Sequence, residues 1–320
     1  MKSGVARLLM SGCLWGAWIM HSGGQELSKA ECCKYIAAYS PSQLVKIESI
    51  QPKPTKTVVE MTADDLKRRY SELSTLKFNL DQGSLDLLLK NVGNNIDVFS
   101  RDLANISCKE RVHFQIITRK KTFSAKESQK EFSYLILPRQ TGFPWTEDRA
   151  DKKGRPVQND PKFCISKGYA YTCAYLHPDH QKCSVFRCLG RDKGAYVLAF
   201  AQKPEAEDYL TGYVDATSGT ALQFLVQGFV WLNAENCQIA RMKTCMLFPS
   251  GSLREQNTDI YYQETRFDNI TQSFWLPKEV TITWSFPSVM CKNQHKYSDF
   301  RLFSVEANYI LDKPQAKKPY

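Results

Sequence analysis

The stretch Val280-Thr281-Ile282-Thr283-Trp284-Ser285-Phe286 decides the fold class of this chain. Large apolar residues occupy every second position, and small polar residues stand between them. A period of two over seven residues is typical of a strand with one face on a core and the other in water. The wider stretch 224–306 reads as five such strands with almost no helical pattern. We therefore expect a mainly β protein.

Further strands are predicted on both sides of this stretch. The pattern predicts strands at 112–116, 132–137, 185–190, 196–202, 225–233, 238–248, 258–267, 276–286 and 290–305. The polar segment 120–130 reads as a hairpin turn, and 139–162 reads as loop because it is rich in Pro, Gly, Asp and Lys. Gly194, near the end of Arg191-Asp192-Lys193-Gly194, suits a tight hairpin. Sequential strands joined by short turns favour a mainly antiparallel meander.

The segment 84–103 is the best predicted helix. Its apolar residues recur at helical spacing and form one stripe, which consists of Leu85, Leu88, Leu89, Val92, Ile96, Phe99 and Leu103. Such a stripe must be buried, and the strands that follow are the expected partner. Gly93 costs about 1 kcal/mol inside a helix, so packing must compensate for it. Upstream, Thr62 is predicted to cap a short helix with Asp64 and Asp65 in its first turn.

The N-terminus reads as a secretory signal peptide. Met1 to Arg7 is basic, Leu8 to Met20 is an apolar or small run of 13 residues, and small residues follow. That run is shorter than the roughly 20 residues of a membrane span. An uncleaved anchor or a buried helix is the alternative. No other stretch approaches a membrane span, so we expect none after removal of the signal peptide.

Charge and cysteine content fit an exported chain. Removal of residues 1–25 leaves 41 Lys and Arg against 33 Asp and Glu, or about +8. This mild positive excess is typical of a soluble protein and would also favour binding to an anionic surface. The basic residues are scattered and form no nucleic-acid-binding motif. Ten of the eleven cysteines remain after that removal. Disulfides are permitted outside the cytoplasm, although several cysteines occupy apolar strand positions and suit a buried core equally well.

The sharpest local pattern is C-x3-H-x2-H-x2-C. It comprises Cys173, His177, His180 and Cys183, which are weak candidates for a metal site because Cys and His are natural zinc ligands. The spacing fits no standard zinc finger. A disulfide among Cys164, Cys173, Cys183 and Cys188, or unremarkable buried cysteines, are the other interpretations, and we favour these over a metal.

No recognisable catalytic motif or cofactor-binding loop accompanies the strands. His295, Ser298 and Asp299 are the residue types of a Ser-His-Asp catalytic triad. Residues along one strand alternate between its two faces, however, so these three side chains do not converge. His295 and Asp299 share a face with Tyr297, and we expect a surface or edge hydrogen-bonded pair there. We therefore predict neither an enzyme nor a bound cofactor.

Three segments together resemble known proteins. They are Phe186–Gln202, Gln227–Met242 with its Val230-Trp231-Leu232-Asn233 core, and Leu276-Pro277 with the closing strand through Phe303. They resemble a group of uncharacterised exported bacterial proteins, and the order of elements is similar to the lipoprotein-carrier (LolA-like) half-barrel over residues 85–306. The resemblance implies an antiparallel sheet curled around a helix, with an apolar cavity that binds lipids or acyl chains. It implies no catalytic residue.

The expected fold is therefore α+β and mainly β, with a curved antiparallel half-barrel packed around one main amphipathic helix. We expect a signal peptide at 1–25, a loosely ordered segment with a short helix at 26–83, the half-barrel at 84–310 with a loop insertion at 139–183, and a flexible tail at 311–320. The predicted cavity lining is Leu88, Val92, Ile96, Phe99, Trp231, Val280, Ile282 and Trp284.

The favoured function is non-enzymatic binding of an apolar or lipidic ligand in the periplasm or at the cell surface. One alternative is an envelope interaction or scaffold protein with a filled core. Another is a hydrolase whose site lies in the 139–183 insertion. We expect no nucleic-acid partner.

Overall fold

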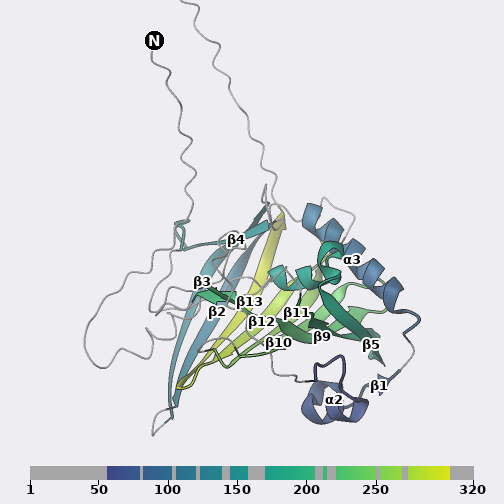
Figure 1. Ribbon diagram of the computed structural model, residues 1–320. Helices are drawn as coiled ribbons and strands as arrows, with labels where there is room; N and C mark the ends of the chain where they lie inside the picture. The colour runs from purple at the N-terminus through teal and green to yellow at the C-terminus, as the bar shows by residue number, and fades with distance from the viewer. Residues whose placement is uncertain are drawn as a thin grey trace, which may run out of the picture.

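The structure is a computed structural model, and one large antiparallel sheet forms most of it (Figure 1). Eleven strands follow the order β1-β5-β6-β9-β10-β11-β12-β13-β2-β3-β4. Neighbouring strands are antiparallel throughout, and the sheet is curved and unclosed. The expected mainly β, half-barrel-like fold class is confirmed. The described residues are 56–79, 82–102, 106–119, 123–138, 145–157, 170–205, 212–214, 221–249, 253–268 and 273–302.

The strands follow the predicted meander closely. Their bounds are β1 Lys77–Phe78, β2 Ile106–Arg119, β3 Phe123–Pro138, β4 Trp145–Ala150, β5 Ser184–Asp192, β6 Ala195–Gln202, β9 Val226–Asn233, β10 Ile239–Met246, β11 Glu255–Thr265, β12 Phe274–Ser285 and β13 Val289–Leu302. A separate two-stranded sheet pairs β7 (Gly212–Val214) with β8 (Ala221–Gln223). The five strands predicted between 224 and 306 are β9 to β13.

Burial along strand β12 explains why the alternating sequence predicted a strand there. From Val280 to Phe286, every second residue is buried and the polar residues between them are partly exposed. The hairpin between β5 and β6 also forms as expected. Lys193 and Gly194 both have positive φ, at 47° and 80°, which matches the left-handed pair that a two-residue hairpin loop requires.

Two predictions about loops were wrong. Residues 123–130, which belong to the predicted turn 120–130, lie inside β3 and pair with β2. Residues 145–150, which read as loop, form the edge strand β4 on β3. Both segments are mostly polar and lack an apolar alternation. Polar cross-strand pairs, such as Gln115 with Glu127, join the first segment to β2 instead.

Helix α3 (Leu85–Asp102) covers one face of the sheet, which we call the inner face. In Figure 1 it lies over the end of the sheet that holds β5 and β9, away from β2 and β3. The short helices η3 (Ala170–Leu176) and α4 (Pro178–Gln181) lie beside it. The predicted stripe is the buried side of α3, with Leu88, Val92 and Ile96 almost fully covered. Leu103 lies outside the described residues.

The opposite, outer face carries residues 56–79. Helix α2 (Ala63–Arg69) begins at Thr62, whose side chain accepts a hydrogen bond from the Asp65 backbone N–H, as predicted. It is followed by η2 (Ser71–Leu73). Leu66 of α2 belongs to an apolar cluster with Val197 of β6. The part of the 26–83 segment that the structure describes is therefore packed and not loosely ordered. Residues 1–55 and 303–320, which include the predicted signal peptide and tail, lie outside the described residues.

Candidate ligand-binding face

The inner face carries one continuous apolar cluster that joins the helix to the strands. On the helix side it includes Leu88, Val92 and Ile96, and on the β12 side it includes Val280, Ile282 and Trp284. Phe99 packs against its border. The structure thus brings seven of the eight predicted lining residues to one cluster. Whether they line a ligand cavity stays a prediction.

Trp231 is the exception, because it lies on the outer face. It packs with Phe229 and with residues of the α2 segment, at a ring-centroid distance of 6.2 Å from Phe229. Its neighbours Val230 and Leu232 belong to the inner cluster instead. Successive residues of a strand point to opposite faces, and β9 is buried on both, so its continuous apolar run hides which residues point inward. The prediction that Trp231 faces the cavity was wrong.

Polar side chains connect α3 to the sheet at two points, one before the helix and one in its second half. Before the helix, the Gln82 amide donates to the Cys188 carbonyl (3.0 Å) and accepts from the Cys188 N–H (2.8 Å), so it extends the ladder of β5. Further along, Asn95 donates to the Asn236 carbonyl (2.9 Å) in the turn between β9 and β10. These hydrogen bonds set the position of the helix above the apolar layer.

Helix α4 packs closely on α3 at Gly93. A Cβ placed on Gly93 would lie 2.9 Å from Gln181 Nε2 and 3.1 Å from Pro178 Cγ. The Gln181 amide donates to the carbonyls of Leu89 (2.9 Å) and Leu176 (2.7 Å), which links both helices. The packing that Gly93 was expected to need is this contact.

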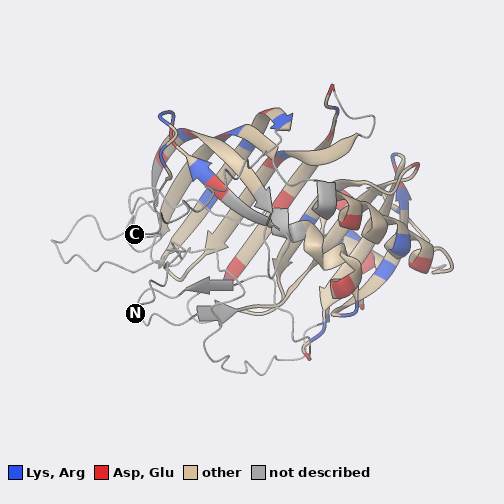
Figure 2. Ribbon diagram, turned by 90° about the horizontal axis from the view of Figure 1, so that it is seen from above, with Lys and Arg blue, Asp and Glu red and all other residues tan. Residues whose placement is uncertain are grey.

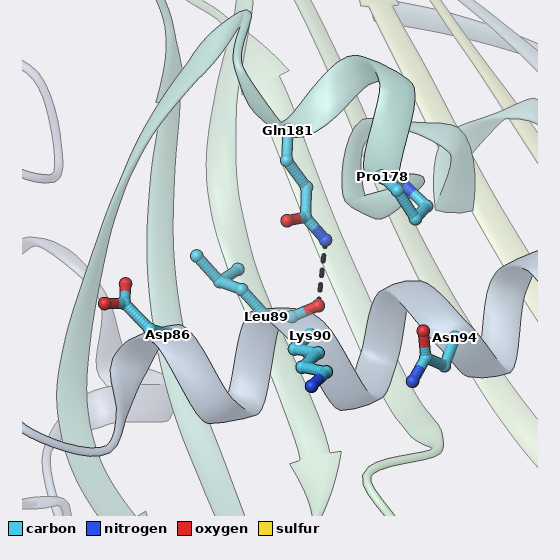
Figure 3. A pocket seen from close by; sticks show the side chains of 6 residues that line it. All are labelled: Asp86, Leu89, Lys90, Asn94, Pro178 and Gln181. Atoms are coloured by element: carbon cyan, nitrogen blue, oxygen red, sulfur yellow. Dashed lines mark hydrogen bonds between the residues drawn. The ribbon is translucent and has the colours of Figure 1, made fainter.

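A shallow pocket of about 330 Å³ opens beside that contact (Figure 3). Asp86, Lys90 and Asn94 line it along one exposed side of α3, together with Leu89 and the two α4 residues Pro178 and Gln181. Its walls mix both charges with apolar carbon, and it lies on the outer side of the helix rather than against the apolar cluster. We therefore place the candidate binding face beneath α3 and not in this pocket.

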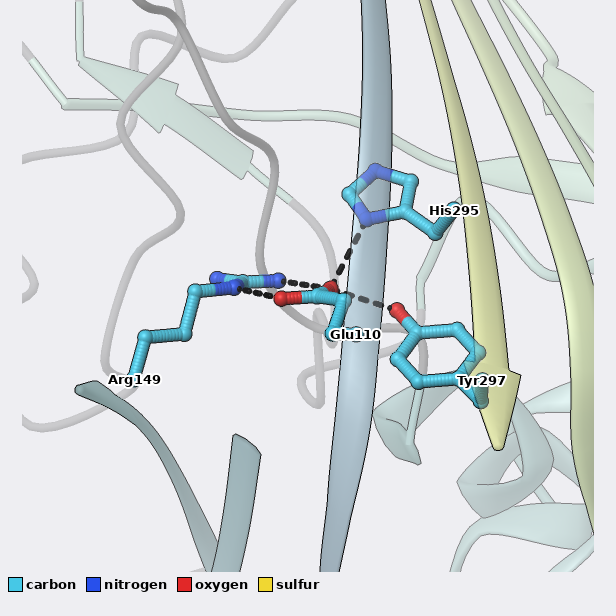
Figure 4. A network of polar contacts seen from close by, with 4 residues as sticks. All are labelled: Glu110, Arg149, His295 and Tyr297. Atoms are coloured by element: carbon cyan, nitrogen blue, oxygen red, sulfur yellow. Dashed lines mark hydrogen bonds and ion pairs between the residues drawn. The ribbon is translucent and has the colours of Figure 1, made fainter. Parts of the chain in front are cut away.

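A buried polar network lies on the inner face at the opposite end of the sheet (Figure 4). Glu110 of β2 is at its centre and is fully buried. Arg149 of β4 binds it through two nitrogens, with Nη2 2.7 Å from Oε1. Tyr297 Oη of β13 donates to Oε1 at 2.8 Å, and His295 Nδ1 lies 2.9 Å from the same oxygen. Three strands that are far apart in the sequence thus meet at one carboxylate.

The electrostatics of this network keep Glu110 ionised. Burial alone would raise the pKa of the carboxyl, but the charge and hydrogen bonds of Arg149, with a contribution from His295, lower it to about 2. The Arg149 guanidinium also lies over the Tyr134 ring at 5.2 Å. The network is a neutralised ion pair, and its chemistry is that of a structural clamp.

Sequence reasoning missed this network. We expected His295 and Asp299 to form a surface or edge pair on one face of a strand. His295 is only 1% exposed and pairs with Glu110, while Asp299 binds Lys109 at 2.5 Å near the surface. A register shift between Ser298 and Arg301, with positive φ at Asp299, breaks the alternation that the expectation used. The one available signal was Glu110 at a buried position of the alternating strand 106–118.

The Cys and His pattern does not form a metal site. In the described part of the chain, no three His, Cys, Asp or Glu side chains are grouped to hold a metal ion. His177 instead caps α4, with Nδ1 accepting from the Asp179 N–H at 3.3 Å. The carboxylate paired with His177 is that of Asp179, which is 82% exposed and not the buried partner that a hydrolase site would need.

The cysteine predictions are answered in part. Cys173, Cys183 and Cys188 are not joined to one another by disulfides. Cys164 lies outside the described residues. Cys291 of β13 is disulfide-bonded. The remaining predicted pairings stay predictions.

Comparison with known proteins finds only solved structures of low sequence identity and low TM-score. No family model and no curated protein sequence matches the chain. Three solved structures are similar to it. A LolA superfamily protein from Nitrosomonas europaea is 13% identical over 68% of this chain and 94% of its own, with a TM-score of 0.29.

Two further structures are similar. A domain described as outer membrane lipoprotein-sorting from Vibrio parahaemolyticus is 10% identical over 67% of this chain and 91% of its own, with a TM-score of 0.32. A DUF1329 family protein from Desulfovibrio piger is 12% identical over 68% and 92%, also with a TM-score of 0.32. The neighbours agree with the resemblance found in the sequence. With TM-scores below 0.5, they carry no inference about the function of this chain.

The described residues show neither a separation of the two charge signs nor a membrane-spanning helix. Lys and Arg are interleaved with Asp and Glu over several strands and helices (Figure 2). No described helix is both long enough and apolar enough to cross a bilayer.

Proposed function

We propose that this chain is an exported, non-enzymatic binding protein that holds an apolar or lipidic ligand on the inner face of the sheet, beneath α3. The observation that carries the proposal is the apolar layer between α3 and the strands, in which helix and strand residues form one cluster. Ligand sites are mainly apolar with a few placed polar groups, and this layer has that composition.

The way in which the sheet is covered supports the proposal. The outermost strands β1 and β4 lie at opposite ends of the strand order and do not pair with each other. The inner face is therefore covered by helices and not by strand closure. Polar contacts of Gln82 and Asn95 hold this helical cover at separate points.

The electrostatics favour an apolar over an ionic ligand. The buried charges of Glu110 and Arg149 neutralise each other and leave no net charge on that part of the inner face. A strongly charged ligand placed against the apolar cluster would lose its hydration without a counter-charge. An aliphatic chain has no favourable hydration to lose, and its burial is favourable by about 0.8 kcal/mol per methylene.

Export is proposed from the N-terminal sequence. The basic start, the 13-residue apolar run and the small residues up to Gln25 form the pattern of a secretory signal peptide. The expected location is the periplasm or the cell surface. Secretion of the full-length chain, with N-terminal sequencing of the product, tests this part separately from ligand binding.

Native mass spectrometry tests ligand binding. Full-length protein exported by its own leader and purified without detergent is expected to carry co-purifying lipid. Delipidated protein is expected to take up added palmitic acid. A folded protein that carries no lipid and takes up no palmitic acid would leave the interaction or scaffold alternative in its place.

Two adjacent leucines of α3 give a matched pair of variants. Leu88 is 5% exposed within the apolar layer, whereas Leu87 is 60% exposed on the same helix. Leu88→Gln is expected to weaken palmitic acid uptake by more than tenfold, and Leu87→Gln is expected to leave it unchanged. Circular dichroism and thermal melting establish that both variants remain folded. Equal uptake by the two variants would remove the layer beneath α3 as the site.

A further inference from the structure

Cys291 carries a disulfide whose partner lies outside the described residues. It is on β13, is fully buried and is disulfide-bonded. The six other cysteines that the structure describes are thiols, namely Cys108, Cys173, Cys183, Cys188, Cys237 and Cys245. The sequence has four more, which are Cys13, Cys32, Cys33 and Cys164. The partner of Cys291 is therefore one of these four.

Cys291 lies on the inner face, away from α3. It pairs with Trp284 of β12 and with Ile116 of β2, and all three residues belong to the inner apolar cluster. Residues that pair directly on adjacent strands share a face of the sheet. In Figure 1, α3 covers the end of the sheet with β5 and β9, away from β2. The segment bonded to Cys291 therefore reaches a part of the inner face that α3 does not cover.

The segment 158–169 begins and ends at the inner apolar cluster. Before it, Val157 packs against the cluster, and its N–H donates to the Arg149 carbonyl at 2.8 Å. After it, η3 begins at Ala170 and brings Cys173 into the same cluster. Cys164 is seven residues from Val157 and six from Ala170. An extended chain spans at most about 3.3–3.6 Å per residue, so Cys164 can lie up to about 20–25 Å from either end.

The two cysteines nearer the N-terminus would need a longer route. The chain enters the described structure on the outer face, where Val58 packs in the cluster with Leu66 and donates its N–H to Gln227 at 2.8 Å. From Cys291, a chain bonded at Cys32 or Cys33 would have to pass around the sheet to reach Val58. Cys13 belongs to the predicted signal peptide and leaves with it. Cys164 needs no such crossing, because both ends of its segment are on the inner side.

We propose that Cys164 Sγ is bonded to Cys291 Sγ, and that the segment 158–169 docks on the inner face over β12, β13 and β2. Phe163 and Ile165 flank Cys164 in the sequence and supply apolar surface for an apolar face. The bond forms by thiol–disulfide exchange. The two thiols lose two protons and two electrons to the disulfide of an oxidant protein, which leaves as a dithiol. The proposed export takes the chain to a compartment where such bonds persist.

The docked segment also limits where a ligand can bind. With the area over β13 and β2 occupied by the chain itself, the area beneath α3 is left for the ligand. This consequence rests on the proposed function, whereas the cross-link does not. Mapping of the disulfide needs no ligand, so a failure of palmitic acid uptake and a failure of the cross-link are separate results.

Peptide mapping identifies the partner of Cys291. The exported full-length protein is alkylated with iodoacetamide in urea without reductant and digested with trypsin. Cleavage after Lys places Cys164 in peptide 163–167, Cys291 in 279–292, and Cys32 with Cys33 in 30–34. Mass spectrometry is expected to find 163–167 joined to 279–292, and to lose this species on reduction. Joining of 279–292 to 30–34, or alkylation of Cys291, would overturn the proposal.

A double-mutant cycle tests whether the bond holds the fold. Cys164→Ser is expected to lower the urea midpoint of wild type, because it releases a constraint on the unfolded chain. With Cys291→Ala already present, the bond is absent, and Cys164→Ser is expected to have almost no effect. The matched control replaces both Cys32 and Cys33 by Ser and is expected to retain the wild-type midpoint. An equal effect of Cys164→Ser in both backgrounds would contradict the cross-link.

Limited proteolysis of the native protein tests the docking of the segment. Lys162 and Lys167 flank Cys164, and trypsin is expected to cut at both several times faster in Cys164→Ser than in wild type. Lys152, whose side chain is 80% exposed in the preceding turn, is the internal control and is expected to be cut equally in both proteins. Equally fast cleavage at Lys162 and Lys167 in both proteins would show that the segment does not dock on the inner face.

Discussion

Arg149 and Glu110 form a buried ion pair that spans an intervening strand. Arg149 is on β4 and Glu110 on β2, and the guanidinium crosses the Tyr134 ring of β3 to reach the carboxylate. Both side chains are almost completely buried, at 4% and 0% exposure. The pair therefore connects the edge strand β4 directly to β2, with which β4 shares no backbone hydrogen bonds.

Removal of Arg149 is expected to be strongly destabilising. Arg149→Met keeps much of the side-chain volume and leaves the Glu110 carboxylate buried without its counter-charge. Breaking one partner of a buried pair costs about 3–5 kcal/mol, so the urea midpoint is expected to fall markedly. Hydrogen exchange of β4 amides is expected to increase more than that of β12 amides.

The control is a surface pair between β2 and its neighbour β3. Arg111 binds Glu131 at 2.8 Å, but both side chains are largely exposed. Arg111→Met is expected to leave the midpoint nearly unchanged, because exposed pairs are screened by water. A small and equal effect of both substitutions would show that the Glu110 clamp contributes little to stability.

Acid is expected to unfold the protein through Glu110. The pKa of Glu110 is lowered to about 2 in the folded state from an ordinary value of 4.5. A depressed pKa stabilises the fold above the unfolded-state value, and that stability is lost as the pH falls from about 4.5 to about 2. The shift corresponds to about 3 kcal/mol. Urea titrations at several pH values in this window measure the slope.

Glu110→Gln is expected to be less stable than wild type at pH 7 and to show a shallower slope below pH 4.5. Asp151 provides the control, because hydrogen bonds from Arg155 lower its pKa to about 2 as well, but at the surface. Asp151→Asn is expected to retain most of the wild-type slope. A wild-type slope in Glu110→Gln would assign the acid sensitivity to other carboxylates.

Substitution of Gly93 is expected to loosen the contact between α3 and α4. Alanine favours a helix over glycine by about 1 kcal/mol. At Gly93, however, the new Cβ displaces the Gln181 amide, which donates to two carbonyls. Loss of two hydrogen bonds at about 1 kcal/mol each exceeds the gain, so Gly93→Ala is expected to lower the free energy of unfolding by about 1 kcal/mol.

A double-mutant cycle isolates that contact. With Gln181→Ala already present, the hydrogen bonds are absent and Gly93→Ala no longer displaces them. The same substitution is then expected to be neutral or stabilising in that background. Equal effects of Gly93→Ala in both backgrounds would place the strain at Pro178 and not at Gln181.

Strand and helix positions could be predicted where one face is apolar and the other polar. Alternation in β12 and the stripe of α3 are local patterns, and each follows from burial on one side. The same reasoning failed at 145–150 and 123–130, which are mostly polar strands without an apolar alternation. It also failed at Trp231. Strand β9 is buried on both faces, so its residues are apolar throughout and the sequence does not show which face each side chain is on.

The sequence by itself determined the antiparallel meander, the main helix and the side of that helix that is buried, because these depend on residues close together in the chain. Only the tertiary structure decided that Glu110, Arg149, His295 and Tyr297 meet. The proximity of these four side chains depends on the order of the strands in the sheet and on the pairing of β13 with β2. Contacts across such distances arise from pairing between strands far apart in the chain, which no local pattern encodes.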